Sequence, residues 1–244
     1  MDCKGARALV TGGARRVGRA AALALADAGC DVAIHYHHSD AEAHELAERI
    51  AHTGRRALAV PGDLAEPATP SALVEDVCRQ LGGLEVLVNN AAVFEADPAG
   101  GFDMAHWERV YRINALAPAA LIAAAEEPLC AHGFGKIVNL CDISAERPWR
   151  RYMAYCASKA ALVSVTRAAA RKLAPRVQVN GVAPGIAVLP DDFDSDLRAK
   201  LVAKVPLGRE GRPEDIAHAV RFLVEQGDYI TGQIINVDGG RSLG

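Results

Sequence analysis

The stretch RALVTGGARRVGRAAALALADA, residues 7–28, decides the fold. It opens with the short apolar run Arg7–Val10, passes through the turn TGGARRVG at Thr11–Gly18 and continues as an alanine-rich helical pattern from Val17 to Ala28. A strand, a glycine-rich turn and a helix in this order let the backbone approach a pyrophosphate at a helix N-terminus. The spacing is not G-x-G-x-x-G, so a tight turn without a ligand is the alternative interpretation.

The rest of the chain repeats this alternation. Further strands are predicted at residues 31–35, 57–60, 84–88, 136–140, 177–182 and 233–237. Helices are predicted at residues 41–51, 71–81, 104–130 (bent near Pro118), 152–173 and 213–225, with a partly helical excursion at 191–205. This pattern predicts an α/β protein whose parallel sheet is doubly wound, with helices on both faces. Since no internal repeat, low-complexity segment or linker interrupts it, residues 1–244 form one predicted domain.

Composition argues against several classes of function. Half of the 244 residues are hydrophobic, and the net charge of −3 comes without a basic block, so nucleic-acid binding has no electrostatic support. The six cysteines form no C-x-x-C pair, which argues against a zinc site or a disulfide framework and indicates a reducing cytosol. The first strand begins near Ala6, which leaves no room for a targeting segment, and no uninterrupted apolar run reaches membrane-spanning length. We therefore expect a cytoplasmic protein with no membrane partner and no metal.

The stretch NLCDISAERPWRRYMAYCASK, residues 139–159, carries the candidate chemistry. Tyr155 and Lys159 are four residues apart at the start of a helical pattern, so both side chains lie on one helix face. An ammonium beside a phenol favours the phenolate, so we expect Lys159 to lower the pKa of Tyr155 and let it pass a proton near neutral pH. Asp142 stands thirteen residues before Tyr155, at the end of a predicted strand. Taken alone, a Tyr and a Lys at this spacing are commonly plain surface neighbours.

The end of the second predicted strand favours the phosphorylated dinucleotide NADP(H), and the ends of the third and fourth fit a dinucleotide crevice. An NAD enzyme usually carries an acid at the end of the second strand, but here His35 opens the run HYHHS at His35–Ser39. No carboxylate repels a 2′-phosphate there, and Arg16 and the polar residues of that run can all bond to one. Asp63 and the run NNAA at Asn89–Ala92 fit the adenine and ribose parts of the same crevice. A plain solvated turn is the main alternative for the histidines, and a metal site is a weaker one.

Together these motifs resemble the short-chain dehydrogenase/reductase family over essentially the full chain. The resemblance rests on Thr11-Gly12 with Gly18, Asp63, Asn89-Asn90-Ala91, Asn114, Tyr155 with Lys159, and Pro184-Gly185. It implies a seven-stranded parallel Rossmann sheet in the order 3-2-1-4-5-6-7. It also implies that Asn114, Tyr155 and Lys159 are catalytic, with Asn114 holding a water that links Lys159 to solvent, and that Pro184-Gly185 lies beside the nicotinamide. The cofactor-binding residues predicted in this way are Thr11, Gly12, Arg15, Arg16, Val17, Gly18, His35, Tyr36, His37, His38, Ser39, Asp63, Leu64, Asn90, Ala91, Ala92, Tyr155, Lys159, Pro184, Gly185 and Ile186.

Two departures from the general family pattern resemble one subfamily in particular, the pteridine reductases. Members that act on alcohols and ketones carry a Ser where this chain has Asp142, and Arg16 replaces the middle glycine of the usual turn. A carboxylate repels a developing alkoxide, which disfavours simple ketone reduction. The run at His35–Ser39 and Phe94 also resemble that subfamily, in which the Phe sandwiches the pterin against the nicotinamide. The predicted substrate-binding residues are Phe94, Asp142, Trp149, Tyr152, Tyr155, Ile186 and Leu189.

Three functions stay open at this point. The first is an NADPH-dependent pteridine reductase that transfers a hydride to a C=N bond of a dihydromonapterin, dihydrobiopterin or dihydrofolate type substrate, with Asp142 and Tyr155 relaying the proton. The second is an NADPH-dependent ketoreductase of the 3-oxoacyl or sugar type, using Ser144 in place of the missing Ser. The third is a non-catalytic dinucleotide-binding protein, against which the intact Asn114, Tyr155 and Lys159 argue. The resemblance also implies a homotetramer.

Overall fold

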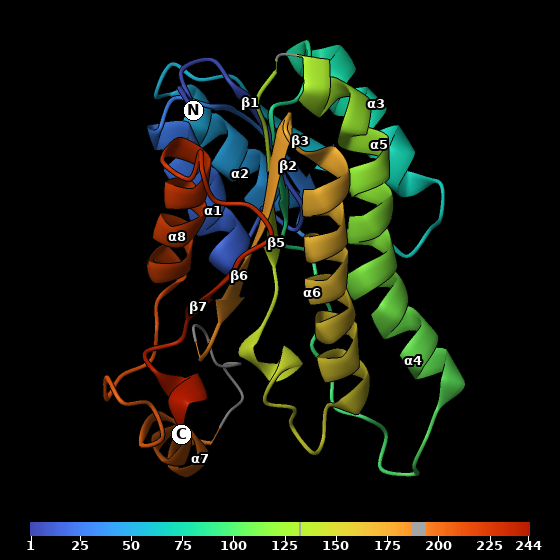
Figure 1. Cartoon of the computed structure of the whole chain (residues 1–244), viewed down its shortest axis with the longest axis vertical. Coiled ribbons are helices and arrows are strands. Elements are labelled where there is room, and N and C mark those ends of the chain that lie inside the picture. The colour runs from blue at the N-terminus through green and yellow to red at the C-terminus, as the bar shows by residue number, and fades with distance from the viewer. Residues whose placement is uncertain (132, 187–193) are drawn as a thin grey trace.

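The computed structural model describes residues 1–131, 133–186 and 194–244, and its centre is a parallel sheet of seven strands (Figure 1). The spatial order is β3-β2-β1-β4-β5-β6-β7, which confirms the order that the family resemblance implies. This order reverses between β1 and β4, so a ligand crevice is expected where those two strands end. The strands are β1 (Arg7–Val10), β2 (Asp31–Tyr36), β3 (Ala57–Pro61), β4 (Val86–Asn89), β5 (Gly135–Leu140), β6 (Val177–Pro184) and β7 (Ile234–Val237).

Helices cover both faces of the sheet, which confirms the doubly wound fold. In Figure 1, α1, α2 and α8 lie on one side and α3, α5 and α6 on the other. The α-helices are α1 (Arg16–Asp27), α2 (Asp40–Ala51), α3 (Thr69–Leu81), α4 (Met104–Tyr111), α5 (Ala117–Ala131), α6 (Met153–Leu173), α7 (Ser195–Val202) and α8 (Pro213–Glu225). Shorter turns are the π-helical η1 (Arg112–Leu116) and the 3-10 turns η2 (Ile143–Ala145) and η3 (Arg241–Leu243).

Side chains of the central strands alternate between two hydrophobic cores. Ala8 and Val10 of β1 belong to the core that contains residues of α1, α2 and α8. Leu9, between them, joins Leu87 of β4 in the core that contains residues of α3, α5 and α6. A strand whose two faces are both buried reads as a continuous apolar run, which is why the sequence indicates these strands clearly.

The long helical region predicted at 104–130 is interrupted, as expected, close to Pro118. The regular α4 gives way to the π-helical turn at Arg112–Leu116 before α5 begins. Pro118 has no N–H to donate to the carbonyl of Asn114, and its ring crowds that carbonyl. The proline therefore favours a wider turn just ahead of it, and this turn holds Asn114, one of the predicted catalytic residues.

By length and composition alone, the helical region Met104–Ala131 meets the criteria for a membrane span. In the α5 part of this region, Leu121, Ala125 and Leu129 are fully buried in the hydrophobic core beside the sheet. The core of a globular protein needs apolar side chains of the same kind. The absence of a membrane partner stays a prediction.

Most predicted boundaries differ from the structure by a few residues. The fourth strand begins at Val86 rather than Leu84, and β6 continues to Pro184. Helix α7 falls within the predicted excursion at 191–205. Residues 187–193, among them the predicted substrate residue Leu189, lie outside the described residues.

Candidate active site

The glycine turn after β1 is cross-linked to the loop after β4. The hydroxyl of Thr11 accepts hydrogen bonds from the backbone N–H groups of Asn90 and Ala91, at 2.9 and 3.0 Å. The side-chain amide of Asn90 donates to the carbonyls of Thr11 and Gly12, at 2.8 and 3.0 Å. A Cβ atom added at Gly18 would lie 2.2 Å from the carbonyl oxygen of Gly12, so only glycine fits there. The turn is thereby a rigid backbone surface at the N-terminus of α1, the kind that accepts a phosphate.

Arg16 begins α1 with a φ of +49°, and it is the one non-glycine residue with a positive φ in the described part of the chain. An L-residue in the left-handed region is disfavoured by roughly 1–2 kcal/mol, and glycine avoids this. The turn has thus kept the backbone conformation of a glycine while carrying an exposed guanidinium. Strain of this kind concentrates at functional sites, which supports a ligand-binding role for Arg16.

His35 supports the turn from within the protein. Its Nδ1 accepts from the N–H of Gly12 at 3.2 Å, and its Nε2 lies 3.1 Å from the carbonyl oxygen of Gly62. Burial lowers the pKa of His35 to about 4, so the ring is neutral near pH 7 and Nε2 carries the proton that Gly62 accepts. His35 therefore shapes the turn, and the exposed polar groups at this end belong to His37 and His38, whose rings stack at 3.6 Å.

The remaining predicted cofactor residues gather at the same edge of the sheet. Asp63 accepts from the N–H of Ala65 at 2.9 Å, and its other oxygen lies 3.8 Å from Nε2 of His37. At the end of β6, a Cβ added to Gly185 would lie 2.7 Å from the Cβ of Asp238, so that glycine also permits a close approach. Others end a strand, follow one or lie at the start of a helix here: Arg15, Val17, Tyr36, Ser39, Leu64, Ala92, Pro184 and Ile186.

Asp142, Tyr155 and Lys159 come together at the carboxyl end of β5. The Tyr155 hydroxyl donates to Oδ2 of Asp142 at 2.8 Å, and the N–H of Ser144 donates to Oδ1 at 2.7 Å. The ammonium of Lys159 donates to the carbonyl of Leu140 at 2.7 Å, and its Nζ lies 5.8 Å from the centroid of the Tyr155 ring. The three side chains that the sequence analysis groups together therefore lie close to one another.

The expected lowering of the Tyr155 pKa is wrong for this arrangement. Burial, followed by the charge of Asp142, raises the pKa of Tyr155 well above its ordinary value. Burial also raises the pKa of Asp142 and lowers that of Lys159. The reason is geometric, because the phenol faces a carboxylate while the ammonium is directed at a backbone carbonyl. Tyr155 is therefore a neutral proton donor whose hydrogen bond leads to Asp142.

The side chain of Asn114 is hydrogen-bonded to the loop after β4 and to α6. Its side-chain oxygen accepts from the N–H of Val93 at 2.9 Å, and its amide donates to the Val93 carbonyl at 3.0 Å and to Ser158 Oγ at 3.1 Å. The side chain is thus fully engaged, and any link to Lys159 would use the backbone carbonyl of Asn114, which Pro118 cannot bond.

Three aromatic rings adjoin the Tyr155–Asp142 pair. Phe94 stacks on Tyr152 at 4.6 Å and meets the Tyr155 ring edge-on at 4.9 Å. Trp149 lies parallel to Tyr155 at 6.3 Å and edge-on to Phe94 at 5.9 Å. The four aromatic residues among the predicted substrate residues thus form an aromatic wall, defined as Phe94, Trp149, Tyr152 and Tyr155.

Asp97 is a residue of this site that the sequence analysis missed. Its carboxylate accepts from the N–H groups of Met153 and Ala154, at 2.6 and 3.2 Å, and so caps the helix that carries Tyr155. A helix cap is normally found in the residue just before the helix, but Tyr152 makes no side-chain cap. Because the cap comes from 56 residues away, no local motif could have indicated it.

A doubly wound sheet, a glycine turn and a Tyr-Lys pair at the strand ends define a dinucleotide-dependent oxidoreductase. A family model described as enoyl-(acyl carrier protein) reductase matches residues 12–242. The 3-oxoacyl-(acyl-carrier-protein) reductase FabG of Staphylococcus aureus is 35% identical over 237 residues, which cover 96% of each chain. The chain belongs to the short-chain dehydrogenase/reductase family.

Two solved structures are similar over nearly the whole chain. FolM alternative dihydrofolate reductase 1 from Brucella canis, complexed with NADP, is 34% identical with a TM-score of 0.93, covering 100% of this chain and 96% of that one. A blue fluorescent protein from a metagenomic library, in complex with NADPH, is 36% identical with a TM-score of 0.92, covering 99% of both. Relatives of this kind therefore include both a folate reductase and, by sequence, a ketoacyl reductase.

Proposed function

We propose that the chain is an NADPH-dependent pteridine reductase that reduces a C=N bond of a dihydropterin to give the tetrahydro form. The observation that carries the proposal is the hydrogen bond from Tyr155 to Asp142 beside the aromatic wall. Where ketone-reducing members of the family carry a neutral serine, this site presents a carboxylate. The similarity to the FolM reductase of Brucella canis supports the same assignment.

The aromatic wall suits a flat heterocycle. Phe94 is 41% exposed, so part of its ring surface is open to a ligand while Tyr152 supports it from one face. Stacking of aromatic pairs contributes about 0.5–1.5 kcal/mol beyond the buried area. A pterin ring system held against Phe94 would lie within reach of Tyr155, whose ring is 4.9 Å from that of Phe94.

Asp142 and Tyr155 supply the proton that the reduced ring needs. Addition at the carbon of a C=N bond leaves the neighbouring nitrogen to be protonated, and the Tyr155 hydroxyl is the donor placed for this step. Because burial raises the pKa of Asp142, that carboxyl holds a proton more readily than an ordinary aspartate and can resupply the phenol. When the nitrogen is protonated before the hydride arrives, ionised Asp142 stabilises the positive charge on the C=N group, which a serine would not.

The residues at the glycine turn fit NADPH, which supplies the hydride when bound. Gly12 and Gly18 are packed closely together, so no side chain at these positions covers the backbone groups that would bind a pyrophosphate. Arg16, whose backbone is strained, places its guanidinium at the same turn. The last two residues of β2 are His35 and Tyr36, and neither is a carboxylate. A 2′-phosphate therefore meets no repulsion from that position. The two solved relatives with NADP and NADPH support this choice.

A 3-oxoacyl or sugar ketoreductase is the second candidate, favoured by the 35% identity to FabG of Staphylococcus aureus. In this reading Ser144 replaces the missing serine. Ser144 is fully buried, however, whereas a group that polarises a substrate carbonyl must reach the ligand. The site therefore favours the pterin over the ketone.

The test is NADPH oxidation measured side by side with dihydrobiopterin, dihydromonapterin, dihydrofolate and a β-ketoacyl substrate. We expect turnover of at least one pterin or folate and little turnover of the ketone. Turnover of the ketoacyl substrate alone would reject the proposal and support the ketoreductase. A cytoplasmic location and a homotetramer stay predictions, and light scattering of the purified protein tests the latter.

A further inference from the structure

The segment Val93–Asp97 carries Phe94 and is held at several places. At its start, the Asn114 side chain bonds both the N–H and the carbonyl of Val93. In its middle, Glu95 forms an ion pair with Arg109 of α4. Since a ring in a loop is only as well positioned as the loop itself, these contacts bear directly on Phe94.

At its end, the segment is joined to the start of α6 by Asp97. The N–H of Asp97 donates to the carbonyl of Arg151 at 2.8 Å, and its carboxylate caps the N–H groups of Met153 and Ala154. Three hydrogen bonds thus connect the loop of Phe94 to the helix start that carries Tyr152. Phe94 lies in the first of these segments, and Tyr152 and Tyr155 lie in the second, so the spacing of these three rings depends on the joint between the segments.

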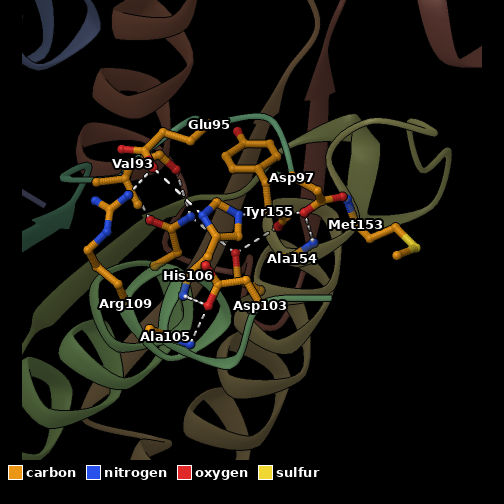
Figure 2. A network of polar contacts seen from close by, with 12 residues as sticks. Val93, Glu95, Asp97, Asp103, Ala105, His106, Arg109, Met153, Ala154 and Tyr155 are labelled. Carbon is orange, nitrogen blue, oxygen red and sulfur yellow. Dashed lines mark hydrogen bonds and ion pairs between the residues drawn. The ribbon is translucent and has the colours of Figure 1, made fainter. Parts of the chain in front are cut away.

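His106 of α4 occupies the space behind this joint. Figure 2 shows its ring between the side chains of Glu95 and Asp97, with Nδ1 3.9 Å from the Glu95 carboxylate and Nε2 3.5 Å from that of Asp97. The His106 side chain is only 8% exposed, and its buried Nε2 has no hydrogen-bond partner in the described part of the chain. The ring thus lies next to the Asp97 carboxylate, which itself contacts the start of α6.

We propose that Asp97 is a positioning residue that sets Phe94 against Tyr152 and Tyr155, with His106 as its support. The inference rests on the proposed function in so far as the positioned ring binds a pterin. The role of Asp97 is to fix the distance between the Phe94 ring, which holds the substrate, and the Tyr155 phenol, which protonates the substrate. A misplacement of about 1 Å at such a site can reduce the rate on the order of 10²-fold.

The experiment compares Asp97→Ala with Asp97→Asn and with the matched control Asp103→Ala. Asp103 caps α4 in the same way, accepting from the N–H groups of Ala105 and His106 at 2.9 and 3.3 Å (Figure 2). We expect Asp97→Ala to raise the pterin KM by about tenfold and to lower kcat, with the NADPH Kd unchanged. Asp97→Asn keeps one acceptor oxygen and should retain most activity. Asp103→Ala should lose similar stability while its pterin KM stays at the wild-type value.

A second readout does not depend on turnover. The chain has two tryptophans, Trp107 and Trp149, so a Trp107→Phe background leaves Trp149 of the aromatic wall as the single reporter. In that background we expect Asp97→Ala to shift Trp149 emission and its quenching by acrylamide, and Asp103→Ala to leave both unchanged. If no pterin is reduced but Asp97→Ala still moves the Trp149 signal, the proposed function fails while the positioning role stands.

His106→Ala tests the same idea without removing the cap, and serves if Asp97→Ala does not fold. It should change the pterin KM and the Trp149 signal in the same direction as Asp97→Ala, by a smaller factor. The inference is overturned if Asp97→Ala, or His106→Ala in its place, loses stability as Asp103→Ala does while pterin KM, kcat and Trp149 emission keep their wild-type values.

Discussion

The glycine turn and the Tyr155–Asp142 site position their groups in different ways. At the turn, backbone groups of Thr11 and Gly12 are fixed by Asn90, and the close approach of Gly12 to Gly18 leaves room for no side chain. At the second site, Tyr155 and Asp142 are placed by the packing of side chains from separate segments. A site made of backbone depends on residue size, whereas a site made of side chains depends on chemical identity.

The same contrast holds for the titratable groups. His35 at the turn is held neutral, with a pKa near 4, and uses both ring nitrogens to fix backbone groups. At the second site, burial raises the pKa of Asp142 and of Tyr155, and the two share one hydrogen bond through which a proton can move. Burial therefore keeps His35 neutral, whereas it raises the pKa of both groups in the hydrogen-bonded pair of Asp142 and Tyr155.

The largest effect is expected from removing the carboxyl of Asp142. Asp142→Ala should lower pterin turnover by about 10²–10⁴, the usual contribution of a positioned acid–base group, with little change in NADPH binding. Asp142→Ser should also lose pterin reduction and gain weak activity on ketones, because a neutral donor then faces the oxyanion. Steady-state assays with both substrates measure this. Wild-type pterin turnover by Asp142→Ser would mean that Asp142 merely caps η2.

Next in size is the effect of filling the turn. Gly18→Ala would place a Cβ 2.2 Å from the Gly12 carbonyl, so the backbone must shift and the protein should lose about 3 kcal/mol of stability together with NADPH binding. The matched control is Gly100→Ala, since a Cβ there meets nothing within 4 Å. Urea unfolding and fluorescence titration with NADPH measure the two effects. Equal behaviour of the two variants would contradict a close-packed turn.

Arg16 tests whether one side chain can matter at a site made of backbone. Arg16→Ala should weaken NADPH by about 1.5–3 kcal/mol, the range for a charge-assisted hydrogen bond, and NADH far less. Arg16→Gly should lose the same preference and yet be more stable by about 1 kcal/mol, because it relieves the φ of +49°. Cofactor kcat/KM ratios and thermal unfolding give the answer. A wild-type ratio in Arg16→Gly would remove Arg16 from the cofactor site.

Phe94 gives a smaller, substrate-specific effect. Phe94→Ala should raise the pterin KM by the loss of about 0.5–1.5 kcal/mol of stacking plus the lost contact area, with NADPH affinity retained. Phe94→Tyr keeps the ring and serves as the conservative comparison. If the affinities for pterin and NADPH fall together, Phe94 is a structural residue and no pterin stacks on it.

The smallest effect concerns stability and pH. Because burial raises the pKa of Asp142, the folded protein binds this proton more tightly than the unfolded chain, and stability falls as pH rises through the folded-state pKa. We therefore expect Asp142→Asn to be more stable than the wild type at neutral pH, with the difference vanishing in acid, where the wild-type carboxyl is protonated. Urea unfolding of both proteins across pH measures this difference, and an Asp142→Asn variant that is less stable at every pH would refute the expectation.

The activity of the wild type should rise as pH falls below neutral.

Reading along the chain is enough to predict the fold and to group several residues of the candidate site. Apolar strands alternating with helices dictate a doubly wound sheet, and the residues that end each strand must then meet at one edge, which is why Thr11, Asn90 and Asp142 were found by reading along the chain. Tyr155 and Lys159 followed from helical spacing.

The direction in which those side chains face depends on tertiary packing. Helical spacing placed Lys159 beside Tyr155, but the fold directs the ammonium to the Leu140 carbonyl and the phenol to Asp142, which reverses the expected change in the pKa of Tyr155. The cap that Asp97 provides to α6 crosses 56 residues of sequence. Local periodicity predicts which groups share a face, whereas hydrogen-bond direction and burial depend on the packing of distant segments.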